Sequence, residues 1–214
     1  MKIIIVGAGQ NGTQVYHILK HNPTIQIAGF LDDNKNKRGT IHCGKPVLGE
    51  IMLLSQIRKE YGITGGIVAI GNNYLRMQYT EKLKNEGLNI INAIHPSAVI
   101  DGTAVLEEGV IIEMGVMIHP EAYIGRCVFV GGSTVIAHHC KVGDSVLLGG
   151  GVIFGGQVSI GEYSLIGVGS VLQPGISIGK NVTLGIGSAV VKNLPDNVVA
   201  LGIPAKVIRN VDPL

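Results

Sequence analysis

Aliphatic residues recur at every sixth position through the second half of the chain. Counting in sixes from Ile94 to Val190 gives seventeen consecutive large apolar residues. The residue two positions earlier is usually small or β-branched, as at Val110 or Thr134, and the residue directly after is often glycine, as at Gly125. Side chains of a strand alternate between its two faces, so the sixth residue and the residue two before it should share an interior.

A step of six residues is too short for a helix and its return, but it suits one short strand and a tight turn. We expect the glycine beside each corner to allow a backbone shape that a Cβ would forbid. Such units cannot bury their apolar face alone, whereas stacking them makes a continuous core. The pattern therefore predicts a three-sided parallel β-helix of hexapeptide repeats with about 18 residues per coil. An antiparallel sandwich would space its strands about 8–12 residues apart.

The first part of the chain alternates apolar runs with amphipathic stretches, as an α/β domain does. We therefore predict two domains, an α/β domain over residues 1–92 and the β-helix domain over residues 93–214. Within the first domain the predicted elements are strands at 2–6, 25–31, 66–70 and 89–94, and helices at 13–20, 51–61 and 74–87.

A G-x-G-x-x-G turn, Gly7 to Gly12, joins the first predicted strand to the first helix. Asp32 directly follows the second predicted strand, at the distance beyond Gly12 that a carboxylate takes in dinucleotide-binding folds. Glycines let the backbone approach a diphosphate, the helix N-terminus offers N–H donors, and the carboxylate suits a ribose hydroxyl. The pattern predicts a Rossmann-like nucleotide site, with a tight turn that binds nothing as the alternative. The domain lacks a second mononucleotide unit, which favours a nucleotide-sugar over a dinucleotide.

Composition narrows the class further. Hydrophobic residues make up 46% and aromatic residues 4%, which favours aliphatic layers over an aromatic core. The net charge is +2 and no basic cluster interleaves with aromatic residues, so we expect no nucleic-acid partner. Three cysteines without paired spacing indicate a reducing compartment. No apolar run reaches the length of a membrane span, and glycine interrupts the first apolar run too early for a signal peptide, so we expect a cytoplasmic protein.

The domain order and several short stretches resemble the sialic acid O-acetyltransferase (NeuD-like) family of hexapeptide-repeat acyltransferases. The resemblance is strongest to the nucleotide-sugar N-acetyltransferases of bacterial glycan synthesis. It implies left-handed coils, a homotrimer with acetyl-CoA between neighbouring β-helices, and acetyl transfer to an amine or hydroxyl of a nucleotide-activated sugar. The matching stretches are GAGQNG, FLDDN, AIGNNYLR, IHPSAVI, VIAHHCKVGD, VVKN and GIPAK.

The same resemblance implies roles for individual residues. His138 matches the general base of the family, and His139 stands where the family often has a carboxylate that orients that base. Gly156 matches a backbone donor to the thioester oxygen, and Val168 and Ile186 match positions along the pantetheine arm. The residues expected to meet the nucleotide-sugar are Gly9, Gln10, Asn11, Asp32, Asp33 and Gly71, with Asn11 replacing a histidine frequent in the family.

Other interpretations stay open from the sequence. His138, His139 and Cys140 could suggest a metal site, but adjacent strand residues point to opposite faces, so we expect none. A nicotinamide-dependent oxidoreductase could use the glycine-rich turn, although it should carry a second mononucleotide unit. A non-catalytic trimer that binds a sugar nucleotide, and an O-acetyltransferase of a sialic-acid-like sugar, are further alternatives. The nucleotide, the sugar and the acceptor atom are not fixed.

Overall fold

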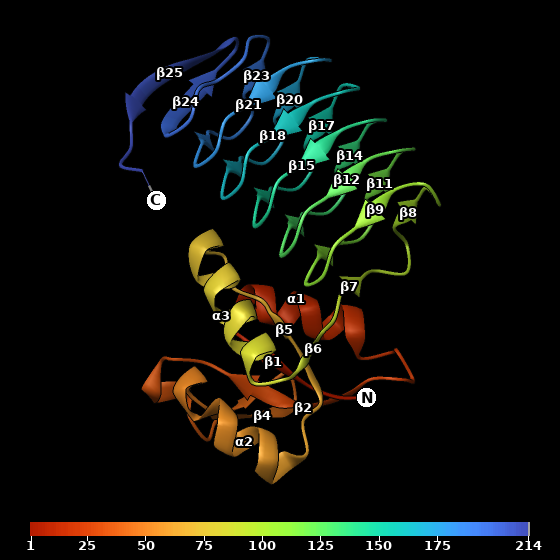
Figure 1. The fold of residues 1–214 in the computed structure, drawn as a ribbon, viewed down its shortest axis with the longest axis vertical. Helices are drawn as coiled ribbons and strands as arrows, with labels where there is room; N and C mark the ends of the chain where they lie inside the picture. The colour runs from red at the N-terminus through yellow and green to blue at the C-terminus, as the bar shows by residue number, and fades with distance from the viewer. Residues whose placement is uncertain (214) are drawn as a thin grey trace. The chain divides into compact units, whose positions relative to one another are not determined.

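The computed structural model describes residues 1–213 and divides the chain into two compact units (Figure 1). Unit 1 is Met1–Ile94, and unit 2 begins at His95. In the described part of the chain no helix has the length and apolar character needed to cross a membrane.

Unit 1 is built on a six-stranded sheet in the order β3-β4-β2-β1-β5-β6. All neighbouring strands run parallel except β3 and β4, which form an antiparallel hairpin. The strands are β1 (Lys2–Val6), β2 (Gln26–Leu31), β3 (Ile41–His42), β4 (Lys45–Gly49), β5 (Gly65–Val68) and β6 (Asn89–Ile90), followed by β7 (Ala93–Ile94). The helices are α1 (Gln10–Leu19), α2 (Leu54–Tyr61) and α3 (Asn73–Asn85), with 3-10 turns η1 (Lys35–Lys37) and η2 (Ile51–Leu53).

Helices cover both faces of this sheet. Ile4 and Val6 of β1 lie in one cluster with Leu54 of α2 and Leu83 of α3, so these two helices share a face. Side chains alternate along a strand, and the ring of Phe30 on β2 packs against Tyr16 of α1, on the opposite face from Leu31. Burial from both sides explains why the strands are continuous apolar runs in the sequence.

The elements of unit 1 follow the predicted order, with differences at their ends. Helix α1 begins at Gln10 rather than at residue 13, because Gly9 serves as its N-cap and the glycine-rich turn already enters the helix. The segment predicted as a helix from residue 51 starts with the 3-10 turn η2, and the segment 89–94 contains two short strands rather than one. The hairpin of β3 and β4 was not predicted, because β3 has only two residues and β4, KPVLG, shows no regular alternation of apolar and polar residues.

Unit 2 is a three-sided parallel β-helix of two-residue strands (Figure 1). Ile112 pairs with Val130 and Val130 with Leu148, so each coil advances by three rungs, as predicted. The first face holds β10 (Ile111–Ile112), β13 (Phe129–Val130), β16 (Leu147–Leu148), β19 (Leu165–Ile166) and β22 (Thr183–Leu184). The second face holds β8 (Val99–Ile100), β11 (Met117–Ile118), β14 (Val135–Ile136), β17 (Ile153–Phe154), β20 (Val171–Leu172) and β23 (Ala189–Val190). The third face holds β9 (Val105–Leu106), β12 (Tyr123–Ile124), β15 (Lys141–Val142), β18 (Ser159–Ile160) and β21 (Ser177–Ile178).

The core of unit 2 is the predicted stack of aliphatic rungs. Every sixth residue from Ile112 to Val190 is buried, and so is the residue two before each rung from Val110 onward. Ile100 and Leu106 are only partly buried, because they belong to the first coil and lack a neighbouring layer on one side. Stacking thus buries what a single coil would leave exposed.

Four of the buried polar residues two before a rung donate to the carbonyl of a glycine in the following coil. Burial raises the pKa of the Cys140 thiol, which keeps it protonated and able to donate. These contacts satisfy groups whose isolation in the core would cost stability. The four hydrogen bonds join Thr134 Oγ1 to Gly149 O at 3.0 Å, Cys140 Sγ to Gly155 O at 3.2 Å, Ser164 Oγ to Gly179 O at 2.9 Å and Ser170 Oγ to Gly185 O at 3.2 Å.

The glycines directly after the rungs serve a different purpose from the one predicted. A Cβ on Gly161 would lie 2.5 Å from the backbone nitrogen of Lys180, in the next coil, and one on Gly149 would lie 2.6 Å from that of Val168. Neither glycine has a positive φ, so the prediction of a special backbone shape was wrong. Close approach of successive coils excludes the Cβ instead. The left-handed residues come two positions later and include Glu121, Cys127, Ser133, His139, Ser145, Gln157, Tyr163 and Asn181, as well as glycines such as Gly151.

A hairpin not predicted from the sequence follows the last coil. Its first strand, β24 (Val198–Gly202), extends the first face by pairing in parallel with β22. The second strand, β25 (Ala205–Asn210), returns antiparallel to β24. Val198 and Ala200 are buried, so β24 covers the end of the rung stack.

Replacing Gly161 with alanine should lower the free energy of unfolding by about 1–3 kcal/mol, because the added Cβ would overlap the next coil. Gly102→Ala is the matched control, since nothing lies within 4 Å of its Cβ position and its φ is not in the left-handed region. Urea denaturation followed by circular dichroism measures both variants. Equal losses in the two would contradict the close-approach explanation.

Candidate active site

In the glycine-rich turn after β1, two glycines allow a backbone shape that a side chain would prevent. A third glycine leaves the surface of the turn open. Gly7 has a φ of +106°, and a Cβ there would lie 2.6 Å from Ala69 O. A Cβ on Gly12 would lie 1.9 Å from Gly7 O, so α1 can approach β1 only without a side chain at this position. Gly9, the N-cap of α1, has nothing within 4 Å of its Cβ position. The chain therefore leaves open space directly in front of the N-terminus of α1.

A cavity of about 370 Å³ occupies this space. It lies where β1, β2 and β5 end, at the point where the strand order reverses around β1, which is the usual binding crevice of open parallel sheets. No side chain caps α1 and its first turn has no acidic residue, so its N-terminus suits an anion. The lining residues are Gly7, Gly9, Gln10, Asn11, Asp32, Ala69, Ile70 and Gly71.

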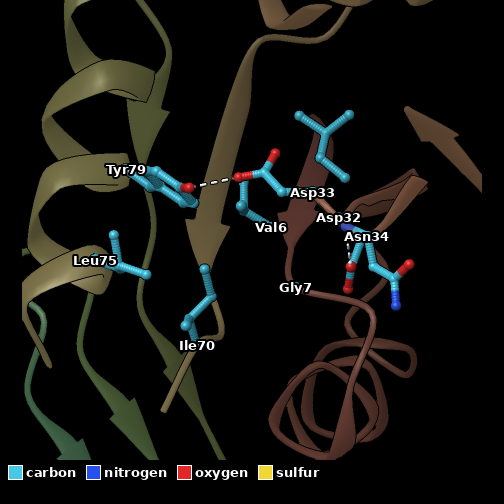
Figure 2. Close-up of a pocket in the computed structure, with 9 residues that line it drawn as sticks. Val6, Gly7, Asp32, Asp33, Asn34, Ile70, Leu75 and Tyr79 are labelled. Carbon is cyan, nitrogen blue, oxygen red and sulfur yellow. Dashed lines mark hydrogen bonds between the residues drawn. The ribbon is translucent and has the colours of Figure 1, made fainter. Parts of the chain in front are cut away.

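A second cavity of about 250 Å³ adjoins the first and shares Gly7, Asp32 and Ile70 with it (Figure 2). Its wall is largely apolar, with Leu75 and Tyr79 projecting from α3 toward the ends of the strands. The full lining is Val6, Gly7, Leu31, Asp32, Asp33, Asn34, Ile70, Leu75 and Tyr79.

All six residues predicted to meet the nucleotide-sugar line the two cavities. The larger cavity is lined by Gly9, Gln10, Asn11, Asp32 and Gly71, and the smaller one by Asp32 and Asp33. Leu75 and Tyr79 were missed. Their spacing of four residues on a helix that starts just after Gly71 places them on one face, and this signal was available in the sequence.

Asp32 is held as a carboxylate by its neighbours. Burial alone would raise its pKa, but the hydrogen bonds it accepts from Lys37 Nζ at 2.9 Å and from the N–H groups of Asn34 and Ala8 lower the pKa by more. The net pKa lies below the ordinary value of 3.8. An ionised carboxylate accepts about four hydrogen bonds, so Asp32 can accept one more from a ligand hydroxyl.

Asp33 instead links η2 to α3 through hydrogen bonds. Its Oδ1 accepts from the backbone N–H of Ile51 at 2.9 Å, and its Oδ2 accepts a short hydrogen bond from the hydroxyl of Tyr79 (Figure 2). The bond to Asp33, with burial and the carboxylate charge, raises the pKa of Tyr79 to about 12. Asp33 therefore fixes the ring of Tyr79 in the wall of the smaller cavity.

In unit 2, His138 lies at the corner between the second and third faces, two residues after the end of β14. Its side chain is exposed, and a Cβ on Gly156, one coil further, would lie 2.6 Å from both Cε1 and Nε2 of the imidazole. The ring therefore lies against a position that has no side chain. Sequence reasoning named both residues, and the structure brings them together.

His139 lies beside His138 on the same side of the chain, contrary to our prediction. The two Nδ1 atoms are 3.0 Å apart, and the ring planes are nearly perpendicular at 88°. The prediction applied strand alternation, whereas both residues belong to a turn and His139 has a φ of +60°. His139 Nε2 also lies 2.9 Å from a carboxylate oxygen of Glu121, a residue that the sequence analysis did not single out. Among residues 1–213 no three His, Cys, Asp or Glu side chains gather as a metal site.

Val168 and Ile186 lie at a different corner, between the first and second faces. They stack in successive coils, with the N–H of Gly187 bonded to Val168 O at 2.8 Å, and their exposed fractions are 58% and 81%. Within one chain the second face thus has His138 and Gly156 along one edge and Val168 and Ile186 along the other. The structure does not bring these two pairs together in one protomer.

Comparison with known proteins gives related matches for both units. Residues 2–83 match the family described as PglD N-terminal domain, and residues 139–174 match bacterial transferase hexapeptide (six repeats). The solved structure of PerB from Caulobacter crescentus, in complex with CoA and GDP-perosamine, is similar with a TM-score of 0.92 and 34% identity, covering 98% of each chain.

The acetyltransferase domain of PglB from Neisseria gonorrhoeae, in complex with acetyl coenzyme A, is similar with a TM-score of 0.88 and 28% identity. This match covers 97% of this chain and 98% of that one. UDP-N-acetylbacillosamine N-acetyltransferase of Bacillus subtilis is 32% identical over 110 residues, 51% of this chain and 50% of that protein. The match thus spans about half the length of this curated relative.

The raised pKa of Tyr79 gives a test of the Asp33 contact. Asp33→Asn should move the phenol titration from about 12 toward 10, which ultraviolet absorbance measures, with Tyr79→Phe identifying the Tyr79 signal. A raised pKa stabilises the fold below the unfolded value, so the free energy of unfolding should fall as the pH rises from 10 toward 12. That fall should be smaller in Asp33→Asn. Unchanged titration in this variant would contradict the assignment.

Proposed function

The chain belongs to the family of two-domain hexapeptide-repeat acetyltransferases that includes PerB, and from this premise we propose that it is a nucleotide-sugar N-acetyltransferase. It transfers an acetyl group from acetyl-CoA to an amine of a nucleotide-activated sugar. The observation that carries the proposal is the exposed imidazole of His138 lying against Gly156. The alternative, acetylation of a hydroxyl on a sialic-acid-like sugar, uses the same groups and differs only in the acceptor atom.

The two adjoining cavities of unit 1 are the proposed site for the nucleotide, in a Rossmann-like arrangement. The phosphates lie against the N-terminus of α1, where Gly9 has no Cβ and Gln10 and Asn11 line the wall. The smaller cavity takes the ribose and base, with Asp32 accepting from a ribose hydroxyl and Leu75 and Tyr79 providing apolar surface. GDP-perosamine is bound to PerB, and this supports a nucleotide-sugar as the ligand class.

The chemistry is a direct transfer in which His138 moves one proton. Acetyl-CoA supplies a thioester whose carbonyl carbon is open to attack. Nε2 of His138 takes the proton of the acceptor amine as the new C–N bond forms and the C–S bond breaks, and the proton then passes to the departing thiolate. The backbone N–H of Gly156 is the proposed donor to the thioester oxygen, and its missing side chain lets the His138 imidazole lie beside that donor.

We also propose left-handed coils and a homotrimer, in which the second face packs against a neighbouring protomer. The outward residue of every strand on this face is apolar, whereas the third face presents Lys141, Ser159 and Ser177 beside Val105 and Tyr123. A closed ring would bring the His138 edge of one protomer to the Val168 and Ile186 edge of the next, and the pantetheine arm would lie between them. The apolar outward residues are Val99, Met117, Val135, Ile153, Val171 and Ala189.

A cytoplasmic location is part of the proposal. Cys43, Cys127 and Cys140 form no disulfide with one another, as expected in a reducing compartment.

His138→Asn should lower kcat by about 10²- to 10⁴-fold with little change in KM for acetyl-CoA, because it removes the proton acceptor and keeps the size of the site. Release of free thiol, measured with UDP-, GDP- and dTDP-linked amino-sugars and their hydroxyl counterparts, reports the rate and the acceptor atom. His21→Asn, an exposed histidine in unit 1, is the control. Equal turnover in wild type and His138→Asn would remove His138 from the mechanism.

A further inference from the structure

Glu121 and His139 occupy equivalent positions in successive coils. Each is the third residue after a rung of the second face, they are one full coil apart, and each has a φ of +60°. The N–H of His139 donates to the carbonyl of Pro120 at 3.1 Å, which ties one turn to the other. Glu121 Oε2 lies 2.9 Å from His139 Nε2, and His139 Nδ1 lies 3.0 Å from His138 Nδ1. Three side chains therefore form one continuous hydrogen-bonded chain at the corner.

We propose that Glu121 and His139 are positioning residues that hold His138 with its proton on Nδ1 and leave Nε2 free to act as the base. This inference rests on the proposed function for its catalytic consequence, but the tautomer itself can be observed without any reaction.

The donor and acceptor roles of Glu121, His139 and His138 follow from one another along their series of hydrogen bonds. An ionised carboxylate only accepts, so Glu121 requires a proton on His139 Nε2. In neutral His139 the other nitrogen, Nδ1, then carries a lone pair and must accept. His138 Nδ1 therefore donates, and its Nε2 is left unprotonated. Free histidine in water favours the opposite tautomer, with the proton on Nε2, so the contact reverses the intrinsic preference.

The free nitrogen is on the side where the proposed chemistry occurs. Nε2 of His138 is one of the two ring atoms closest to the open Cβ position of Gly156. When Nε2 of His138 accepts a proton, Nδ1 of the same ring continues to donate to His139. None of the three hydrogen-bonded side chains therefore has to rotate. The carboxylate of Glu121 then faces a positively charged pair of rings. The glutamate thus substitutes, from one coil away, for a carboxylate next to the base.

The effect of this contact is one of orientation more than of charge. The side chains of His139 and Glu121 are 51% and 63% exposed, so water screens their electrostatic attraction. A hydrogen bond still selects which nitrogen carries the proton. Loss of Glu121 should therefore affect the proton-transfer step and leave binding of acetyl-CoA nearly unchanged.

The direct test is ¹⁵N NMR of histidine-labelled protein at a pH where the rings are neutral. In the wild type, His138 should show a protonated Nδ1 and an unprotonated Nε2, with His138→Asn identifying its signals. In Glu121→Ala the proton should shift substantially to Nε2. Glu162→Ala is the matched control, an exposed turn carboxylate at another corner, and should leave the tautomer unchanged. A protonated Nε2 in the wild type, or identical spectra for wild type and Glu121→Ala, would overturn the proposal.

Kinetics provide the second readout. Glu121→Ala should lower kcat about tenfold with unchanged KM for acetyl-CoA, and Glu121→Gln should recover most of the loss, since its amide oxygen also accepts from His139. His139→Asn suits the left-handed φ, and in that background Glu121→Ala should cause no further loss. Full activity of Glu121→Ala, or additive losses, would overturn the positioning role. If His138→Asn were fully active while the NMR result held, the proposed function would fail but the tautomer assignment would stand.

Discussion

Unit 2 depends on one constraint, the hydrogen-bonded stacking of coils at a fixed advance of three rungs per coil. Each strand pairs with the strand one coil away in parallel register, as Ile112 does with Val130. A residue at a corner therefore lies against its counterparts in the preceding and the following coil. The rung positions become continuous aliphatic columns, and at several of the positions after them, such as Gly161, the coils approach so closely that a Cβ would not fit. A substitution at one corner consequently changes the contacts with the coils on both sides.

The same stacking makes the corner chemistry possible. Gly156 is the counterpart of His138 in the next coil, and its missing side chain leaves room against the imidazole. Glu121 is the counterpart of His139 in the preceding coil, which brings a carboxylate to a ring that has no acidic neighbour in the sequence. In unit 1 a different rule applies, because the ends of parallel strands meet at one edge. That edge brings Gly9, Asp32 and Gly71 around one cavity.

Much of this could be predicted from the sequence, because regular periods report local geometry. The six-residue period indicated the rungs, the buried residues two before them, and three rungs to each coil. The G-x-G-x-x-G turn and Asp32 indicated the cavity in unit 1. The contact of Glu121 with His139 was missed because it joins turns one full coil apart, whereas the six-residue period reports only the rung positions. The relation of His138 to His139 was predicted incorrectly because the alternation rule of strands was applied to a left-handed turn.

The central claim is that each site is completed by the His138 edge of one protomer and the Ile186 edge of the next. Mixing two inactive variants, His138→Asn and Ile186→Asp, after confirming that each alone is trimeric, tests it directly. If sites are shared, random mixed trimers contain sites with both edges intact, and the equimolar mixture should regain about a quarter of wild-type activity. A mixture as inactive as its two parents would contradict the claim, since it would place both edges of the site in a single protomer.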